Sequence, residues 1–165
     1  MRAEIVGLMS LLLVGGCSFE LTPEGRAGCE TTVTSVSEGS ATMLPGAVCG
    51  TCHHRFTAAG TVFTTVDSAC DTGHAADVRV EILDSAGNTA ITLTTNEAGN
   101  FYTNAALPSP YTARITAPDG TIQQMRTAQT DGRCAECHRE PPTEHALGRI
   151  AVVVPPTDGG VPDAH

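Results

Sequence analysis

A strand-and-turn rhythm in the middle of the chain constrains the fold more than any other feature of the sequence. Short β-branched or alternating segments recur about every ten residues from 58 to 126. Turn sequences separate them, among them Asp84-Ser85-Ala86-Gly87-Asn88 and Asn96-Glu97-Ala98-Gly99-Asn100. Strands of this length and spacing are typical of an antiparallel β-sandwich, and no stretch has sustained helical periodicity. The predicted fold class is therefore all-β.

The alternation also places the individual strands. Val78, Val80 and Ile82 alternate with Arg79 and Glu81, as in a strand with one buried face. Similar patterns predict strands at 61–66, 78–82, 91–94, 101–102, 111–115, 122–126 and 150–154.

Two copies of one five-residue pattern, C-x-x-C-H, flank the sandwich. They are Cys49-Gly50-Thr51-Cys52-His53 and Cys134-Ala135-Glu136-Cys137-His138. This is the attachment pattern of c-type haem, because two thiols three positions apart lie on one side of a tight turn and can form thioethers to the porphyrin edge. The following imidazole can coordinate the iron. We therefore expect two haem c groups, attached at Cys49, Cys52, Cys134 and Cys137, with His53 and His138 as proximal iron ligands.

Zinc is the main alternative cofactor. The two C-x-x-C pairs could form one four-cysteine site with the sandwich inserted between them. However, a His follows both pairs, and with six His in 165 residues this coincidence would arise by chance about once in a thousand. A thioredoxin-like role fits poorly because no βαβ pattern surrounds either pair.

The sixth iron ligand determines what a haem can do. The candidates are His54, His145 and His74, and no Met occupies an obvious position. Coordination by two imidazoles is therefore favoured, which gives a low reduction potential compared with His/Met coordination. His54 follows a proximal ligand directly, so it could serve the haem of the other motif.

The N-terminus has the pattern of an export signal. A short apolar run in residues 1–16 ends in small residues before Cys17, which resembles a bacterial lipobox and predicts lipidation of Cys17. Residues 17–48 then read as a Ser/Thr/Gly-rich tether, 49–154 as the sandwich with its two motifs, and 155–165 as a disordered tail. Ser18 in place of Asp favours the outer membrane, on its periplasmic or cell-surface face.

The two remaining cysteines, Cys29 and Cys70, form an even pair in an exported chain. An oxidising compartment favours a disulfide between them, although unpaired thiols or a ligand role stay open. The bridge would close a loop of about 40 residues and contribute about 4 kcal/mol on the chain-entropy model.

Charge narrows the range of partners. The net charge is -9, with nine Arg and no Lys, which argues against binding to nucleic acid. We expect redox proteins as partners, together with the membrane that holds the lipid anchor.

Four segments of the central region carry a resemblance to a known family. They are Gly60-Thr61-Val62, Val78-Arg79-Val80-Glu81-Ile82-Leu83-Asp84, Thr94-Thr95-Asn96-Glu97-Ala98-Gly99-Asn100-Phe101 and Tyr111-Thr112-Ala113-Arg114-Ile115. Over about 58–126 the chain resembles a carboxypeptidase regulatory-like domain, a family that implies a transthyretin-like β-sandwich without catalytic residues. With the two flanking motifs it also resembles secreted cytochrome-like lipoproteins of δ-proteobacterial type, which implies haem binding.

These observations predict a carrier of single electrons and not an enzyme. No G-x-S-x-G nucleophile turn, phosphate-binding loop or H-E-x-x-H sequence is present. Two alternatives remain open. One is a zinc-stapled β-sandwich that acts as a binding or structural module at the cell surface, and the other is a haem sensor or enzyme with one five-coordinate iron.

Overall fold

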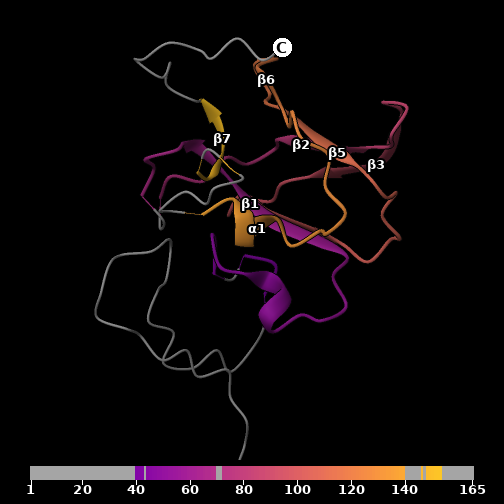
Figure 1. Cartoon of the computed structure of the whole chain (residues 1–165). Coiled ribbons are helices and arrows are strands. Elements are labelled where there is room, and N and C mark those ends of the chain that lie inside the picture. Colours follow the sequence, from indigo (N-terminus) through magenta and orange to yellow (C-terminus); the bar gives the residue numbers. More distant parts are fainter. Residues whose placement is uncertain (1–39, 43, 70–71, 140–145, 147, 154–165) are drawn as a thin grey trace, which may run out of the picture.

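The computed structural model describes residues 40–42, 44–69, 72–139, 146 and 148–153, and within them almost every regular element is a strand (Figure 1). Each of the seven strand regions expected from the sequence contains or overlaps one of these strands, so the all-β prediction is confirmed. The elements are η1 (Cys49–Thr51), β1 (Ala58–Thr65), β2 (Arg79–Leu83), β3 (Thr89–Thr94), β4 (Asn100–Thr103), β5 (Thr112–Thr116), β6 (Ile122–Gln124), α1 (Cys134–Cys137) and β7 (Ile150–Val153).

The strands form two sheets. One has the order β4-β1-β7 and the other β3-β2-β5-β6. All pairs between these strands are antiparallel except β1 with β7, in which Val62 is aligned with Ile150 in parallel. The sequence predicted antiparallel pairing throughout, so this pair is a departure. A parallel pair needs a long crossover, and the chain supplies one because the other sheet and the second motif lie between β1 and β7.

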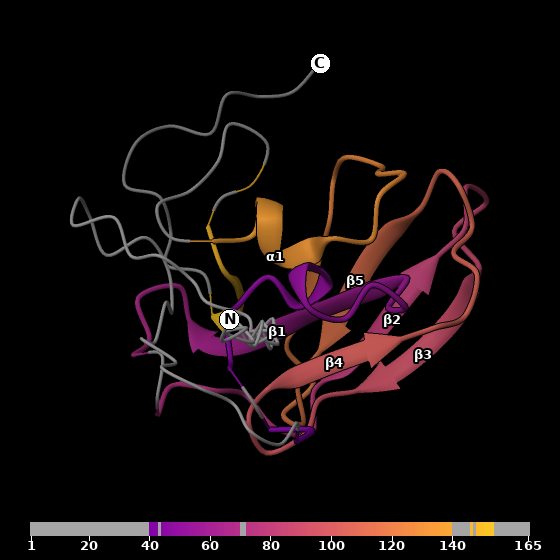
Figure 2. The same ribbon diagram turned by 90° about the horizontal axis from the view of Figure 1, so that it is seen from below.

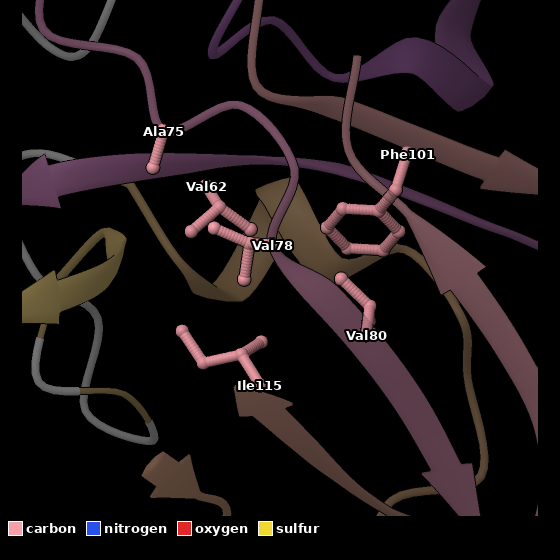
Figure 3. Close-up of a cluster of buried hydrophobic side chains, with 6 residues drawn as sticks. All are labelled: Val62, Ala75, Val78, Val80, Phe101 and Ile115. Atoms are coloured by element: carbon pink, nitrogen blue, oxygen red, sulfur yellow. The ribbon is translucent and has the colours of Figure 1, made fainter. Parts of the chain in front are cut away.

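The core lies between the two sheets (Figure 3). Val62 and Phe101 come from one sheet, and they face Val80 and Ile115 from the other. All four are at most 6% exposed, so each contributes about 1.5–3 kcal/mol by leaving water. Ala75 and Val78, from the segment before β2, complete the cluster.

The segment before the first motif is attached to this sandwich. The backbone N–H of Gly46 donates to Thr61 Oγ1 over 2.8 Å. The side-chain amide of Asn100 donates to the Ala41 carbonyl. Thr61 Oγ1 in turn donates to Asn100 Oδ1 over 2.7 Å. The packed part of the chain therefore includes residues on the N-terminal side of Cys49.

Candidate functional site

The two C-x-x-C-H motifs adopt the same closed turn. In the first, which begins with η1, the backbone N–H of His53 donates to the Cys49 carbonyl over 2.9 Å. In the second, which contains α1, the N–H of His138 donates to the Cys134 carbonyl over 2.8 Å. This hydrogen bond places the backbone of each His directly after one closed turn that contains both cysteines.

The first thiol of each motif is also oriented in the same way. Cys49 Sγ donates to the Ala47 carbonyl at 3.6 Å, and Cys134 Sγ donates to the Gly132 carbonyl at 3.3 Å. Both are therefore thiols that point back toward the preceding chain, whereas the second cysteines, Cys52 and Cys137, are exposed. Two segments that lie 85 residues apart thus orient their first thiols in the same way.

Strand β1 brings the motifs together. Its residue Ala59 donates its N–H to the Gly132 carbonyl over 3.3 Å, just before α1. The next residue, Gly60, leaves room for the second motif, since a Cβ there would lie 3.3 Å from Cys134 Cβ. Figure 2 shows α1 and the indigo turn of η1 beside each other over β1.

The space between the two turns is small. A cavity of about 10 Å³ lies there, lined by Cys49 and Gly50 of one motif, Arg133 and Ala135 at the other, and the neighbouring Val48, Phe56, Ala59 and Gly132. A porphyrin cannot enter a cavity that holds about one water molecule. Any haem must therefore lie outside this contact, on the sides where Cys52 and Cys137 are exposed.

Hydrogen bonds between charged side chains stabilise the second turn. Asp131 accepts from the backbone N–H of Arg133 over 2.9 Å and from its Nε over 2.8 Å. These hydrogen bonds hold the pKa of the Asp131 carboxyl below its usual range. Arg133 also donates to Glu136 Oε1 over 3.0 Å. The same Asp131 accepts from the buried Tyr111 hydroxyl through its carbonyl, at 2.5 Å, so the turn is also fixed to the residue that precedes β5.

The first thiol of each motif is protonated at neutral pH. Burial raises the pKa of the Cys49 thiol. Burial, with smaller effects from the neighbouring Cys49 and Cys137, raises the pKa of Cys134 to about 11. Because a reactive disulfide oxidoreductase needs a lowered thiol pKa, this environment is unlike that of a redox thiol pair.

His138 is held in one orientation by a backbone carbonyl. Its Nδ1 lies 3.0 Å from the Gly148 carbonyl oxygen, near the start of β7. Burial lowers the pKa of this imidazole, which favours the neutral ring. A neutral ring that donates through Nδ1 presents the lone pair of Nε2, the arrangement usual for a metal-binding His.

His53 is held by an aromatic contact. Its ring stacks on Phe56 with centroids 4.8 Å apart and planes 19° apart. It faces an open hollow lined by Cys52, His54, Arg55, Phe56 and Asn104. This hollow is the surface next to the exposed thiol of the first motif.

The candidate distal ligands lie in different places. His54 is exposed in the hollow beside His53. His74 forms an isolated bridge with Phe63, toward the far end of β1, and its ring is 6.0 Å from that of Phe63. His145, Cys17, for which the sequence predicts lipidation, and the cysteine pair Cys29 and Cys70 lie outside the described residues.

The supporting residues were not identified from the sequence. Asp131-Gly132 before Cys134 is a turn signal in which Asp caps the following backbone, so this part was detectable. Tyr111, Phe56 and Tyr102 were not, because a single sequence does not show which aromatic residue packs under which motif. Their role follows from the ring stack of Phe56 and Tyr102 and from the hydrogen bond of the Tyr111 hydroxyl, which only the structure shows.

A single four-cysteine site is not formed. Within the part of the chain that the structure describes, no three His, Cys, Asp or Glu side chains gather as a metal ion would require. A zinc site would need the two turns to rotate so that all four sulfur atoms converge.

Similarity to known proteins adds nothing to this geometry. Comparison with protein-family models, with curated proteins and with solved structures finds no match. Among the described residues, no helix has the length and apolar character needed to cross a bilayer.

Proposed function

We propose that this chain is an exported, lipid-anchored c-type cytochrome that carries two haems and transfers single electrons. The observation that carries the proposal is the equivalence of the two C-x-x-C-H turns, each closed by the same backbone hydrogen bond and each with an exposed second cysteine. The haem supplies the one-electron chemistry, and the protein supplies attachment, axial ligands and surroundings.

The residues fit this cofactor. Cys49 and Cys52 would hold one haem, and Cys134 and Cys137 the other, once the thiols of Cys49 and Cys134 leave their carbonyl contacts. His138 has its Nδ1 engaged by a carbonyl, so Nε2 is the atom available to iron. His53 lies beside an open hollow and would serve as the ligand of the first haem.

The second axial ligand of each iron is proposed from His54, His145 and His74. Of the two candidates in the described residues, His54 is the nearer to a motif, because it borders the hollow of the first one. Two imidazoles on each iron would leave no open position for a substrate. We therefore propose a carrier and not an enzyme, with a low reduction potential.

The sandwich acts as the scaffold in this proposal. A transthyretin-like, carboxypeptidase regulatory-like arrangement would place both motifs at one strand, and β1 contacts both turns. The partners would be redox proteins at the membrane to which a lipid on Cys17 anchors the chain. The outer membrane is the proposed location, and the net charge of -9 makes nucleic acid an unsuitable partner.

The test is the intact mass and visible spectrum of the mature protein, made in a host with a cytochrome maturation system. We expect a red protein whose mass exceeds that of the polypeptide by two haem groups. Replacing Cys49 and Cys52 together with Ala should remove one of them, and replacing Cys134 and Cys137 should remove the other. A colourless protein without added mass from the same host would contradict the proposal.

One observation favours zinc as a second candidate. Cys49 of the first motif and Ala135, next to Cys134 in the second, line the same small cavity. A zinc-stapled β-sandwich without redox function would use all four cysteines for one metal ion. Metal analysis distinguishes the two, because this candidate requires one zinc per chain, no iron and no absorption in the visible range.

A further inference from the structure

Three aromatic rings form a stack that begins at the first motif. The His53 and Phe56 centroids are 4.8 Å apart with planes 19° apart, and the Phe56 and Tyr102 centroids are 4.7 Å apart with planes 18° apart. Both pairs have the spacing and near-parallel planes of stacked rings. The stack leads from a proposed iron ligand to Tyr102 on β4, which is 46% exposed.

Backbone contacts on both sides hold this stack in place. Tyr102 is aligned with Ala59 in the β1–β4 pair. Thr57, which follows Phe56, donates to the Thr103 carbonyl through its N–H over 2.8 Å and through Oγ1 over 3.0 Å. The N–H of Phe56 donates to the His53 carbonyl over 3.1 Å. The two supporting rings are therefore placed by the fold itself.

The second motif has a different support. There, Nδ1 of His138 meets the Gly148 carbonyl at 3.0 Å. One imidazole is thus fixed by a hydrogen bond and the other by a ring stack, although the two turns share a sequence pattern and a backbone conformation. The chain surrounds two similar ligands with different neighbours.

We propose that Phe56 and Tyr102 are positioning residues, which fix the plane of the His53 ring and keep water from the face that packs on Phe56, so that the first iron site differs from the second in potential. This inference rests on the proposed function. An apolar shell around a metal ligand limits the access of water to the site, and the access of water affects the reduction potential of the metal. Because oxidised iron carries more positive charge than reduced iron, water admitted to the first site stabilises the oxidised form.

The test is a redox titration of the complete di-haem protein, followed by its visible spectrum. In Tyr102→Leu and Phe56→Leu, we expect the equilibrium constant for reduction of the first site to fall by about threefold or more. This lowers its reduction potential by about 28 mV for a one-electron couple. The second site should keep its potential. The two sites are assigned with the Cys134→Ala/Cys137→Ala protein, which retains the first haem.

Two matched variants isolate the effect of the stack. Tyr102→Phe keeps the ring and removes only the hydroxyl, so the potential should stay that of the wild type. Ile122→Ala removes an exposed apolar side chain from β6 and should also leave both potentials unchanged. If Phe56→Leu does not fold, Tyr102→Leu decides the matter, since position 102 lies at the surface.

The outcomes separate the two levels of the proposal. Haem retained with an unchanged first potential in Tyr102→Leu overturns the role of the stack and leaves the cytochrome proposal intact. A shift of both potentials by the same amount also overturns it, because a local shield acts on one site. A wild-type protein without haem contradicts both the role of the stack and the cytochrome proposal.

Discussion

Gly132 passes so close to Thr57 that a Cβ at position 132 would lie 1.8 Å from the Thr57 carbonyl oxygen. It would also lie 2.7 Å from Leu107 Cδ1. The chain that leads into the second motif is thus pressed against the residue that leads into β1. This contact is what allows the two motifs, distant in sequence, to share one strand.

Gly132→Ala should therefore destabilise the protein strongly. The nearest clashing group is the backbone carbonyl of Thr57, so the backbone must move, and we expect a loss of about 3 kcal/mol in the free energy of unfolding. Urea denaturation followed by circular dichroism measures it. Gly50→Ala is the matched control in the first motif, because the nearest atom to its added Cβ is 3.9 Å away. Equal losses in the two variants would contradict this reading of the contact.

The hydroxyl of Tyr111 makes a second link to the same turn. It donates to the Asp131 carbonyl at 2.5 Å from a residue that is 3% exposed. Tyr111→Phe removes the donor and leaves the carbonyl without it, so we expect a loss of about 1 kcal/mol. Urea denaturation again gives the value, and Tyr102→Phe, at an exposed position, should lose less than about 0.5 kcal/mol. A neutral result for Tyr111→Phe would show that water replaces the hydroxyl.

An ion pair on the outer face of the second sheet predicts a dependence of stability on pH. Arg114 Nε lies 2.9 Å from Glu81 Oε2 across the β2–β5 pair. This hydrogen bond, with help from Thr89 and the charge of Arg79, lowers the pKa of the Glu81 carboxyl. Its usual value in an unfolded chain is about 4.3. The stabilisation is therefore complete above about pH 4.3 and is lost as the pH falls toward the lower pKa of the folded state.

Glu81→Gln tests this dependence. The wild-type protein should be more stable than the variant at pH 7, and the difference should shrink as the pH falls below about 4.3. Thermal unfolding at a series of pH values gives the difference directly. Glu97→Gln changes the same charge at an exposed position and serves as the control. A difference that grows on acidification would have the wrong sign for a lowered pKa.

The sequence predicted the strands well because alternation is a local signal. Val80 and Ile82 are buried apolar residues, and Glu81 between them pairs with Arg114, so the alternation visible in the sequence is kept although Glu81 is itself only 7% exposed. The direction of pairing is different, because nothing in residues 150–153 specifies that β7 runs parallel to β1. The parallel direction of β7 depends on the end of β1 at which the chain between the two strands comes back to the sheet.

The motifs were likewise visible, but their surroundings were not. The motif with Cys134 and Cys137 is a local pattern of five residues. The carbonyl that orients His138 belongs to Gly148, ten residues further along the chain. Phe56 lies three residues from His53, yet Tyr102, on which its ring stacks, belongs to the distant strand β4. Contacts between distant segments depend on packing, and a single sequence does not encode them as a pattern.

The carbonyl of Gly148 provides a last prediction, on the second site alone. Gly148 is buried and has φ of 103°, in the region that residues with a Cβ rarely adopt. Gly148→Ala should cost about 1–3 kcal/mol in unfolding free energy and move the carbonyl away from His138. A weaker hydrogen bond makes the imidazole a less basic ligand, so the reduction potential of the iron proposed at the second motif should rise while that proposed at the first stays constant.

Gly87→Ala separates backbone strain from this local effect. Gly87 has φ of 81° in the turn between β2 and β3, and an added Cβ meets no atom within 4 Å. It should lose stability for the same conformational reason, because a left-handed φ is unfavourable for Ala, but it has no contact with either motif. Redox titration of both variants gives the comparison. If Gly87→Ala moved the second potential as much as Gly148→Ala, the change would reflect general destabilisation and not the orientation of His138.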